Sequence, residues 1–266
     1  NARVWYISPN EPHNKMAYFV DAPYQVDKIS DQTFADWQKK AGEIALKLPE
    51  LNPYIPDDFS LIKTTKAYPH PELIVDEPTL RVVYTPSRYF ASEPKADVSV
   101  VLRNPKAMNS AKNQVMFALN DYLAGIALDQ LSNQAAVGGI SFSTNANNGL
   151  MVNANGYTQR LPQLFQALLE GYFSYTPTEE QLEQAKSWYA QMMDSAEKGK
   201  AYDLALMPTQ MLSQIPYFQR EDRRALLPSI TLKDVLAYRD ALKTNTRPEF
   251  LIVGYMSDVQ AKTLAE

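Results

Sequence analysis

The chain has 266 residues, a net charge of −4, 45% hydrophobic residues and 21% charged residues, a composition typical of a soluble globular protein. The negative balance gives no reason to expect nucleic acid as a partner, because proteins that bind it usually present a basic face. No apolar run approaches the roughly 20 residues that a membrane-spanning helix requires, so we expect no membrane partner either.

The first 59 residues are rich in proline and charge, and they start without methionine, so we expect a piece cut from a longer protein. Residues 4–7 and 16–20 are predicted strands. Apolar residues at helical spacing predict a helix over residues 31–46, with Ser30 as its N-cap. Three prolines within residues 49–56 prevent both a helix and a central strand, and they indicate a stiff, extended connector.

The middle of the chain has the pattern of a sheet followed by a long helix. Residues 73–75, 80–84 and 98–102 are predicted strands because of their β-branched content and alternation. Asn104 before Pro105 has the pattern of an N-cap and first helical residue, and the helix is expected to end at Gly138-Gly139. Its predicted inner face carries Met116, Leu119, Leu123, Ile126 and Ala127.

The remainder combines a hairpin, several helices and a returning strand. Residues 140–144 and 150–154 flank Asn147-Asn148-Gly149, which accepts the positive φ of a hairpin turn. A helix is predicted over residues 161–173, and a second begins at the capping box Thr176-Pro177-Thr178-Glu179 with proline at N1. A third is predicted over 202–212 with a break near Pro208, and two more begin at Thr231 and Ser257. Residues 250–255 are predicted to form a buried strand. The predicted buried side chains of the second and fourth of these helices are Leu182, Ala185, Tyr189 and Met192, and Val235, Tyr238 and Leu242. This order predicts an α+β fold with helices packed on a mixed, mostly antiparallel sheet.

The scarcity of reactive side chains restricts the chemistry. The chain has two histidines and no cysteine, whereas most zinc sites, cysteine nucleophiles and serine triads need imidazole or thiolate groups. His13 lies in a turn-like segment, and His70 lies between Pro69 and Pro71, which force extended backbone. We interpret both as surface or turn histidines.

Other clusters have structural explanations that we prefer to functional ones. Gly138-Gly139 follows a helix and lacks the pattern of a phosphate loop, so it reads as a helix C-cap. Glu179, Glu180 and Glu183 fit the acidic first turn of a helix better than a carboxylate metal cluster. The mixed charges of residues 220–224 indicate a solvated loop or helix start, with an acidic partner as the alternative.

Five aromatic residues have the spacing of core or half-buried positions. The alternative is that an exposed sheet edge among these elements captures an extended peptide through main-chain hydrogen bonds, although the sequence selects no edge. The five are Trp188, Tyr202, Tyr217, Phe218 and Tyr255.

Three segments of the chain resemble parts of a known enzyme family. Residues 52–59 and 68–74 resemble the join between the two halves of the large insulin-degrading metalloproteases of the inverzincin family, and residues 128–142 resemble their helix–hairpin segment. The resemblance covers essentially the whole chain. It implies a periplasmic parent enzyme of four homologous α+β domains in two halves that close over small peptides. It also implies that a first domain, outside this chain, binds zinc through His-x-x-Glu-His and a downstream Glu.

On this resemblance, residues 1–20 are the end of the preceding homologous domain and residues 21–58 are the linker between the halves. Residues 59–266 are then the non-catalytic third domain, which could be truncated at its C-terminus. The expected partners are small peptide substrates and the rest of the parent polypeptide, including its catalytic half and the following domain. The segment would help to enclose the substrate and to hinge the two halves.

The helix that corresponds to the zinc-binding one departs from the catalytic pattern. If Phe117–Asp121 stands in place of His-x-x-Glu-His, both imidazoles and the general base are missing, and Phe117 offers no metal ligand. We therefore expect no catalytic and no metal-binding residue in this chain, with zinc bound elsewhere in the parent. The substrate-binding residues remain unassigned.

Two rival readings stay open. The first is a stand-alone peptide-binding or assembly module of the same fold without protease activity. The second is an independent enzyme with a carboxylate–tyrosine site, in which Asp121 lies near Tyr122 or Tyr157 and needs a shifted pKa.

Overall fold

The structure, a computed structural model, describes residues 3–45, 50–61, 70–86, 92–146, 149–213, 216–244 and 246–266. The chain divides into two compact units, Asn1–Leu51 and Asn52–Glu266. The predicted hairpin turn at Asn147-Asn148 lies outside the described residues, and so does Pro69, the proline that precedes His70.

The N-terminal unit contains a short hairpin and one helix. Strand β1 (Lys15–Met16) pairs antiparallel with β2 (Pro23–Tyr24). Helix α1 (Asp31–Glu43) begins where predicted, and the Ser30 hydroxyl accepts a hydrogen bond from the Thr33 amide at 3.0 Å. None of the described side chains in this unit is buried.

Two strand predictions in this unit are wrong. Residues 4–7 form no strand, and near residues 16–20 the strand is limited to Lys15–Met16. The described part of the unit offers no sheet or core for longer strands to pack against. Helix α1 ends at Glu43, and the residues predicted to continue it include Leu46, which lies outside the described residues.

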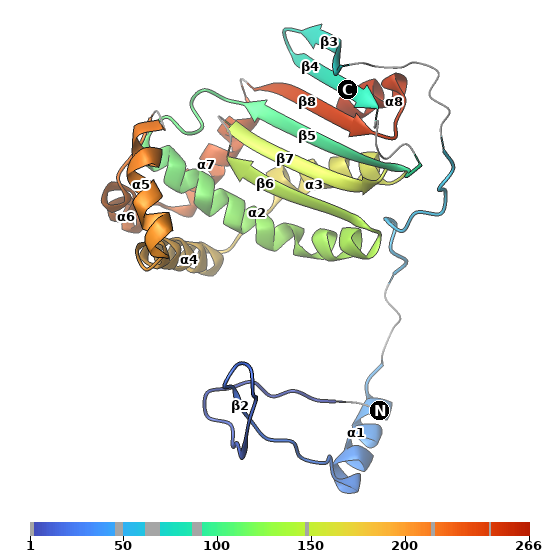
Figure 1. Ribbon diagram of the computed structural model, residues 1–266, viewed down its shortest axis with the longest axis vertical. Helices are drawn as coiled ribbons and strands as arrows, with labels where there is room; N and C mark the ends of the chain where they lie inside the picture. The colour runs from blue at the N-terminus through green and yellow to red at the C-terminus, as the bar shows by residue number, and fades with distance from the viewer. Residues whose placement is uncertain are drawn as a thin grey trace. The chain divides into compact units, whose positions relative to one another are not determined.

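The C-terminal unit is built on a six-stranded sheet with the order β3-β4-β8-β5-β7-β6 (Figure 1). The strands are β3 (Glu72–Glu77), β4 (Leu80–Pro86), β5 (Lys95–Arg103), β6 (Ile140–Ala146), β7 (Gly149–Tyr157) and β8 (Arg247–Gly254). Among the strands that the structure describes, only β4 and β8 pair in parallel, and the other neighbours pair antiparallel. The expected mixed, mostly antiparallel sheet is confirmed.

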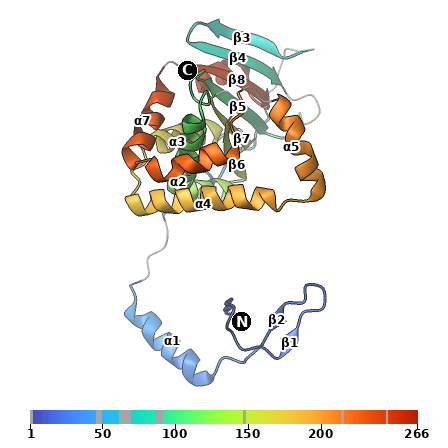
Figure 2. The same ribbon diagram turned by 90° about the vertical axis from the view of Figure 1, so that its left-hand side faces the viewer.

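The helices of this unit are α2 (Ala111–Val137), α3 (Leu161–Ser174), α4 (Glu179–Glu197), α5 (Ala201–Ser213), α6 (Arg220–Leu226), a 3-10 turn at Leu227–Ser229, α7 (Leu232–Lys243) and α8 (Asp258–Ala265). Helices α2 and α3 pack on one face of the sheet, whereas α5 lies on the other side of the strands from α3 and α7 (Figures 1 and 2). Helix α2 is central, since it contacts β6 and helices α3, α4, α6 and α7. The α+β class predicted from the sequence is therefore observed.

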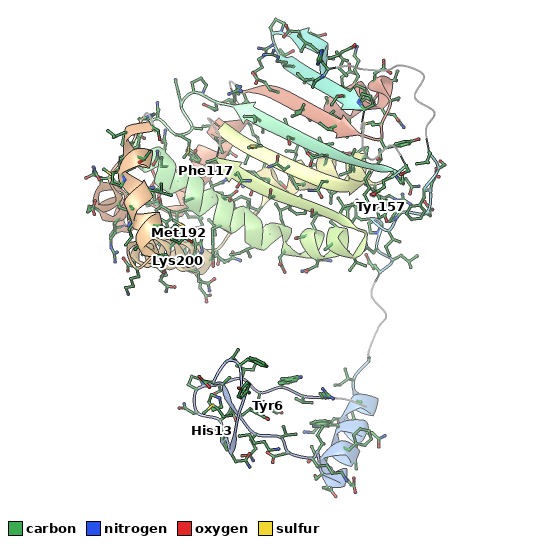
Figure 3. The ribbon with its side chains drawn as sticks, in the orientation of Figure 1. Tyr6, His13, Phe117, Tyr157, Met192 and Lys200 are labelled. Atoms are coloured by element: carbon green, nitrogen blue, oxygen red, sulfur yellow. The ribbon has the colours of Figure 1, made fainter. Side chains whose placement is uncertain are left out.

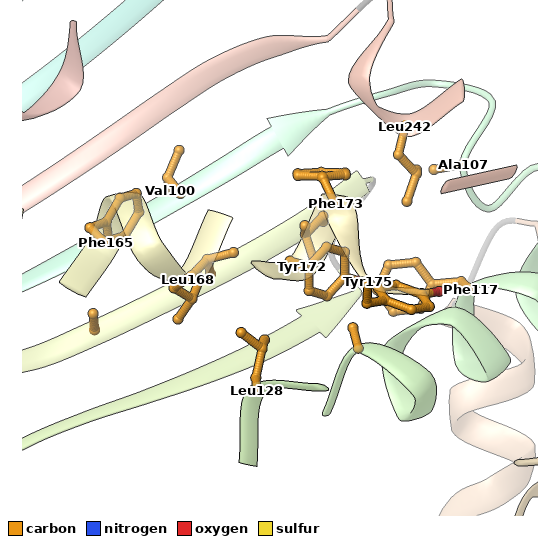
Figure 4. Packing of buried hydrophobic residues seen from close by; sticks show 14 of the residues in the cluster. Val100, Ala107, Phe117, Leu128, Phe165, Leu168, Tyr172, Phe173, Tyr175 and Leu242 are labelled. Atoms are coloured by element: carbon orange, nitrogen blue, oxygen red, sulfur yellow. The ribbon is translucent and has the colours of Figure 1, made fainter. Parts of the chain in front are cut away.

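The core lies between α2, α3 and the central strands (Figure 4). Val100 of β5, Phe165 and Leu168 of α3, and Leu128 of α2 are all buried. Alternation along the strands sends every second side chain into this core, and each fully buried Val, Leu or Phe contributes about 1.5–3 kcal/mol relative to exposure. The opposite face of the sheet carries mostly polar side chains.

Helix α2 starts later than predicted. Its N-cap is Ser110, whose hydroxyl accepts from the Asn113 amide at 3.1 Å. Asn104 instead caps a single turn, accepting from the Lys106 amide at 3.1 Å, while its own amide donates to the Ala241 carbonyl at 3.2 Å. This tie to α7 holds the chain in a turn for a few residues before the helix can begin.

Three predicted core positions are wrong. Ile126 is 39% exposed and Ala127 is exposed, because β6 and α3 cover another side of α2, where Ala124 and Leu128 are buried. In α4, Met192 is 43% exposed and Met193 is buried in its place. Periodicity located the helices, but tertiary packing selected the buried stripe.

Two local predictions are also revised. The capping box of α4 is Thr178 with Gln181, so Pro177 precedes the N-cap and is not at N1. Helix α5 runs continuously through Pro208, whose missing N–H removes only one hydrogen bond of the helix. The predicted N-caps of α7 and α8, Thr231 and Ser257, are confirmed.

Candidate functional site

Phe117–Asp121, which the family resemblance predicts to stand in place of the zinc motif, lie in the N-terminal half of α2. Phe117 is 5% exposed and belongs to the same core cluster as Tyr175 (Figure 4). Asn120 is completely buried, whereas Asp121 is half-buried. The first position of the motif is thus filled by an apolar ring, and only the last two carry polar groups.

Asn120 holds two tyrosines from the neighbouring helix region. Its side-chain amide donates to the Tyr172 hydroxyl at 3.1 Å, and its side-chain carbonyl accepts from the Tyr175 hydroxyl at 2.6 Å. Burial raises the pKa of Tyr172 well above its ordinary value and also raises the pKa of Tyr175. Both phenols therefore stay neutral and serve as hydrogen-bonding groups.

Asp121 is held by hydroxyl groups rather than by cations. The Thr144 hydroxyl of β6 donates to Asp121 Oδ1 at 2.6 Å, and the Tyr172 hydroxyl donates to the same oxygen at 3.3 Å. Burial raises the pKa of the Asp121 carboxyl, and these two hydrogen bonds oppose that shift. No ion pair joins Asp121 to another part of the described chain.

Arg239 of α7 extends this polar cluster at its outer end. Its Nη1 donates to the Tyr175 carbonyl at 2.7 Å, and its guanidinium carbon lies 5.1 Å from the centre of the Tyr175 ring. Together, Asn120, Asp121 and their partners link α2, α3, α7 and β6. This arrangement fixes the mutual positions of four elements.

The donor set does not fit zinc. Across the described ranges, no group of three or more His, Cys, Asp or Glu side chains is placed to hold a metal ion. Catalytic zinc sites use three protein ligands and an open position, and this cluster supplies one carboxylate beside neutral amide and hydroxyl groups. Its chemistry is that of a structural hydrogen-bond network.

The two histidines are exposed. His13 belongs to the N-terminal unit, where its Nδ1 lies 3.4 Å from the Glu11 carbonyl (Figure 3). His70 is also exposed and precedes β3.

The proposed carboxylate–tyrosine pairs are not brought together. Tyr122 stacks on Trp188 of α4 at 4.8 Å between ring centres. Tyr157 lies at the far end of β7, where its ring is 5.1 Å from that of Phe59, and Figure 3 shows it well away from Phe117. The tyrosine that meets Asp121 is Tyr172, which lies 51 residues away in sequence and which no local pattern singles out.

The remaining candidates have structural partners. Gly138 caps α2, and a Cβ there would lie 2.2 Å from the Tyr54 carbonyl oxygen, so close backbone contact explains the glycine. Glu183 pairs with Lys186 at 2.8 Å, in keeping with a solvated helix face. Residues 220–224 form most of α6, where Arg223 donates to the Tyr189 hydroxyl at 3.3 Å.

The aromatic set is divided. Tyr255 is buried, and Tyr217 and Phe218 are half-buried, as predicted. Tyr202 is 60% exposed and Trp188 is 38% exposed, so their predicted core or half-buried positions are wrong. Tyr202 lies on α5, whose described side chains are largely exposed.

The segment that joins the two units is anchored to the C-terminal unit. The Asn52 side-chain amide donates to the Gln134 carbonyl at 2.7 Å, and Tyr54 is buried against the core. The Asp57 carboxylate accepts a hydrogen bond from the Gln159 side-chain amide at 2.6 Å, and it forms an ion pair with Arg160 Nη2 at 3.2 Å. Residues that the sequence assigns to the linker therefore belong structurally to the second unit from Asn52 onward.

Residues 1–225 match the family described as "Middle or third domain of peptidase_M16". The chain belongs to this family of M16 peptidase domains. It is 83% identical to Protease 3 of Escherichia coli strain K12 over 265 residues, covering 100% of the chain and 28% of that relative. It is 23% identical to the insulin-degrading enzyme of Bos taurus over 233 residues, covering 87% of the chain and 23% of that relative.

A solved structure agrees with these matches. The crystal structure of pitrilysin superposes with a TM-score of 0.86 at 83% identity, covering 98% of the chain and 28% of that structure's chain. The resemblance to insulin-degrading metalloproteases is confirmed. The chain is a middle, non-catalytic segment of an M16-type protein. It spans about a quarter of the length of its relatives. Within the described residues, no helix is long and apolar enough to cross a membrane.

Proposed function

We propose that this M16 middle domain is the non-catalytic part of a zinc metalloendopeptidase that degrades small peptides. The observation that carries the proposal is the cluster of buried Phe117, buried Asn120 and half-buried Asp121, whose side chains cannot assemble a hydrolytic metal site where the family resemblance predicts the zinc motif. Zinc would be held by sequence outside this chain. The segment would close the peptide chamber, limit substrate size and exclude bulk water.

We further propose that residues 1–20 end the preceding homologous domain, that 21–58 link the two halves, and that 59–266 are the third domain. The N-terminal unit supports the part of this proposal that ties the segment to a larger polypeptide, because none of its described side chains is buried and it would need cover from the parent. Its most exposed large hydrophobic residues, each at least 73% exposed, are Trp5, Tyr6, Ile7, Tyr18, Phe19, Val20 and Leu51.

A periplasmic location is part of the same proposal. It follows from the family resemblance and from the bacterial origin of the relatives at 80–83% identity, such as Protease 3 of Escherichia coli and of Salmonella typhi. Fractionation of cells that express the parent protein, with antibody detection of this segment, would test it. Recovery of the parent in the cytoplasmic fraction would contradict it.

The test of function compares the purified chain with its parent protein. We expect the chain to bind no zinc and to leave a quenched fluorogenic peptide intact, while the parent cleaves it until a chelator is added. Metal analysis of both samples gives a readout independent of activity. Chelator-sensitive cleavage by the chain alone would refute the proposal.

The rival, a stand-alone peptide-binding or assembly module, differs in the size of the native gene product. The proposed parent should have an intact mass several times the 30.1 kDa of this chain, whereas the stand-alone module should be close to 30.1 kDa.

A further inference from the structure

The sheet of the C-terminal unit ends in two very different edge strands. Within the described chain, β3 pairs only with β4, and β6 pairs only with β7. Unpaired edges present free main-chain N–H and C=O groups, and proteins usually protect them with charge, proline or bulges. The two edges can therefore be compared for such protection.

Strand β3 carries several protective features. Glu72, Asp76 and Glu77 give it three carboxylates in six residues. Its register against β4 is interrupted between Leu73 and Val75, and Arg247 Nη2 donates to Asp76 at 2.9 Å. Charge and irregularity both oppose the addition of another strand here.

Strand β6 carries none of them. Its seven residues, Ile-Ser-Phe-Ser-Thr-Asn-Ala, include no charge and no proline. The register against β7 is unbroken from Ile140, opposite Gly156, to Ala146, opposite Leu150. A regular, neutral edge of this length is a template for an added strand.

The edge is also rigidly supported from behind. The Thr144 hydroxyl bonds Asp121 of α2 at 2.6 Å, and α2 packs along β6. Binding to a strand that is already fixed avoids the entropy cost of ordering it. The neutral edge is thus prepared for main-chain pairing.

A polar surface continues from this edge across the solvent-facing side of the sheet; it is neutral over β6 and β7 and carries Asp97 on β5, whose carboxylate accepts from the Ser99 hydroxyl at 3.4 Å. The Ser141 hydroxyl donates to Asn155 Oδ1 at 2.9 Å, and the Ser99 hydroxyl donates to Asn153 Oδ1 at 2.8 Å. These bonds use the amide oxygens and leave both Nδ2 groups directed to no acceptor in the described part of the chain. We call this the Ser/Asn surface; its members are Ser99, Ser141, Ser143, Asn145, Asn153 and Asn155.

We propose that the free edge of β6, with the Ser/Asn surface beside it, binds an extended peptide segment as an additional strand. The choice of a peptide as occupant rests on the proposed function, and the absence of charge at the edge favours segments without charge where they pair. Main-chain hydrogen bonds do not read side chains, so the site accepts varied sequences. It would retain unfolded peptides inside the chamber at a point separate from hydrolysis.

The test uses the chain with a soluble probe, acetyl-Lys-Thr-Val-Ser-Val-Thr-Lys-amide, and a control probe N-methylated at both valines. Amide exchange at residues 141–146 should slow by about tenfold or more with saturating probe, while exchange in β3 should not change. The N-methylated probe should give no protection, because it lacks the donors. Unchanged exchange in β6, or equal protection of β3, would overturn the proposal.

The lack of cysteine allows a second readout, since Ser143→Cys introduces a single thiol for a spin label. The label on β6 should broaden the probe's NMR signals, and the same label on a Leu73→Cys control in β3 should not. Dimerisation through β6 with no probe bound would assign the edge to a second copy and overturn the proposal. The parent's zinc content and peptidase activity test the proposed function independently of these results.

Discussion

The side-chain amide of Asn120 donates to the Tyr172 hydroxyl at 3.1 Å, and that hydroxyl donates in turn to Asp121 at 3.3 Å. One phenol thus satisfies two adjacent residues of α2 from a neighbouring helix. The relation stabilises this part of α2, and it makes Tyr172 the most informative residue to alter.

Tyr172→Phe should lower the free energy of unfolding by about 1–3 kcal/mol, because it leaves the buried Asn120 amide without its acceptor. Urea denaturation followed by circular dichroism measures the change. Tyr122→Phe is the matched control, since the Tyr122 ring stacks on Trp188 and its loss of a hydroxyl should change stability by less than about 0.5 kcal/mol. Equal effects of the two substitutions would contradict the assigned network.

Asp121→Asn tests the raised pKa of this carboxyl. A folded-state pKa above the unfolded value means that the protonated acid favours folding at low pH, and that this contribution is lost as pH rises through the folded-state pKa. At pH 7 the variant should therefore be more stable than the unsubstituted chain, and this gain in stability should shrink as the pH falls toward 4. Unfolding curves at several pH values measure this; a difference that is independent of pH would count against it.

Two glycines of the α2 region should respond to alanine with opposite signs. Gly138→Ala should destabilise by about 1–3 kcal/mol, because the new Cβ would lie 2.2 Å from the Tyr54 carbonyl oxygen. Gly125→Ala has nothing within 4 Å of its Cβ and should stabilise the helix by about 0.5–1 kcal/mol. Thermal unfolding of both variants decides the matter, and a stabilising Gly138→Ala would show that Tyr54 is not held there.

Thr231→Ala should remove the N-cap of α7 and cost about 1 kcal/mol. The same change should raise the pKa of Asp234, since hydrogen bonds from Thr231 are the main cause of its low value of about 2. NMR titration of the Asp234 carboxyl measures this shift, and Thr231→Ser, which keeps the hydroxyl, should leave it low. An unchanged pKa in the alanine variant would assign the shift to the Thr231 backbone amide and to Lys112 instead.

Local features of the fold could be predicted from the sequence because their causes are local. Ser30, Thr231 and Ser257 act as N-caps through residues only three positions away. The start of α2 was missed because the tie from Asn104 to Ala241 spans 137 residues. A local pattern cannot contain such information.

The candidate site shows the same division. The lack of metal ligands at Phe117 is visible in the sequence alone, as is the similarity to insulin-degrading enzymes. The partners of Asp121, however, come from Thr144 and Tyr172, which lie 23 and 51 residues away. Their meeting depends on how β6 and α3 pack on α2, and only the folded structure shows it.

The unburied side chains of the N-terminal unit have a consequence for the isolated polypeptide. With nothing of its own interior to protect it, a stretch that exposes Trp5, Ile7 and Phe19 should be the first part digested by a protease such as chymotrypsin. Digestion should then leave a resistant fragment that begins close to Asn52, where hydrogen bonds and the buried Tyr54 attach the chain to its core.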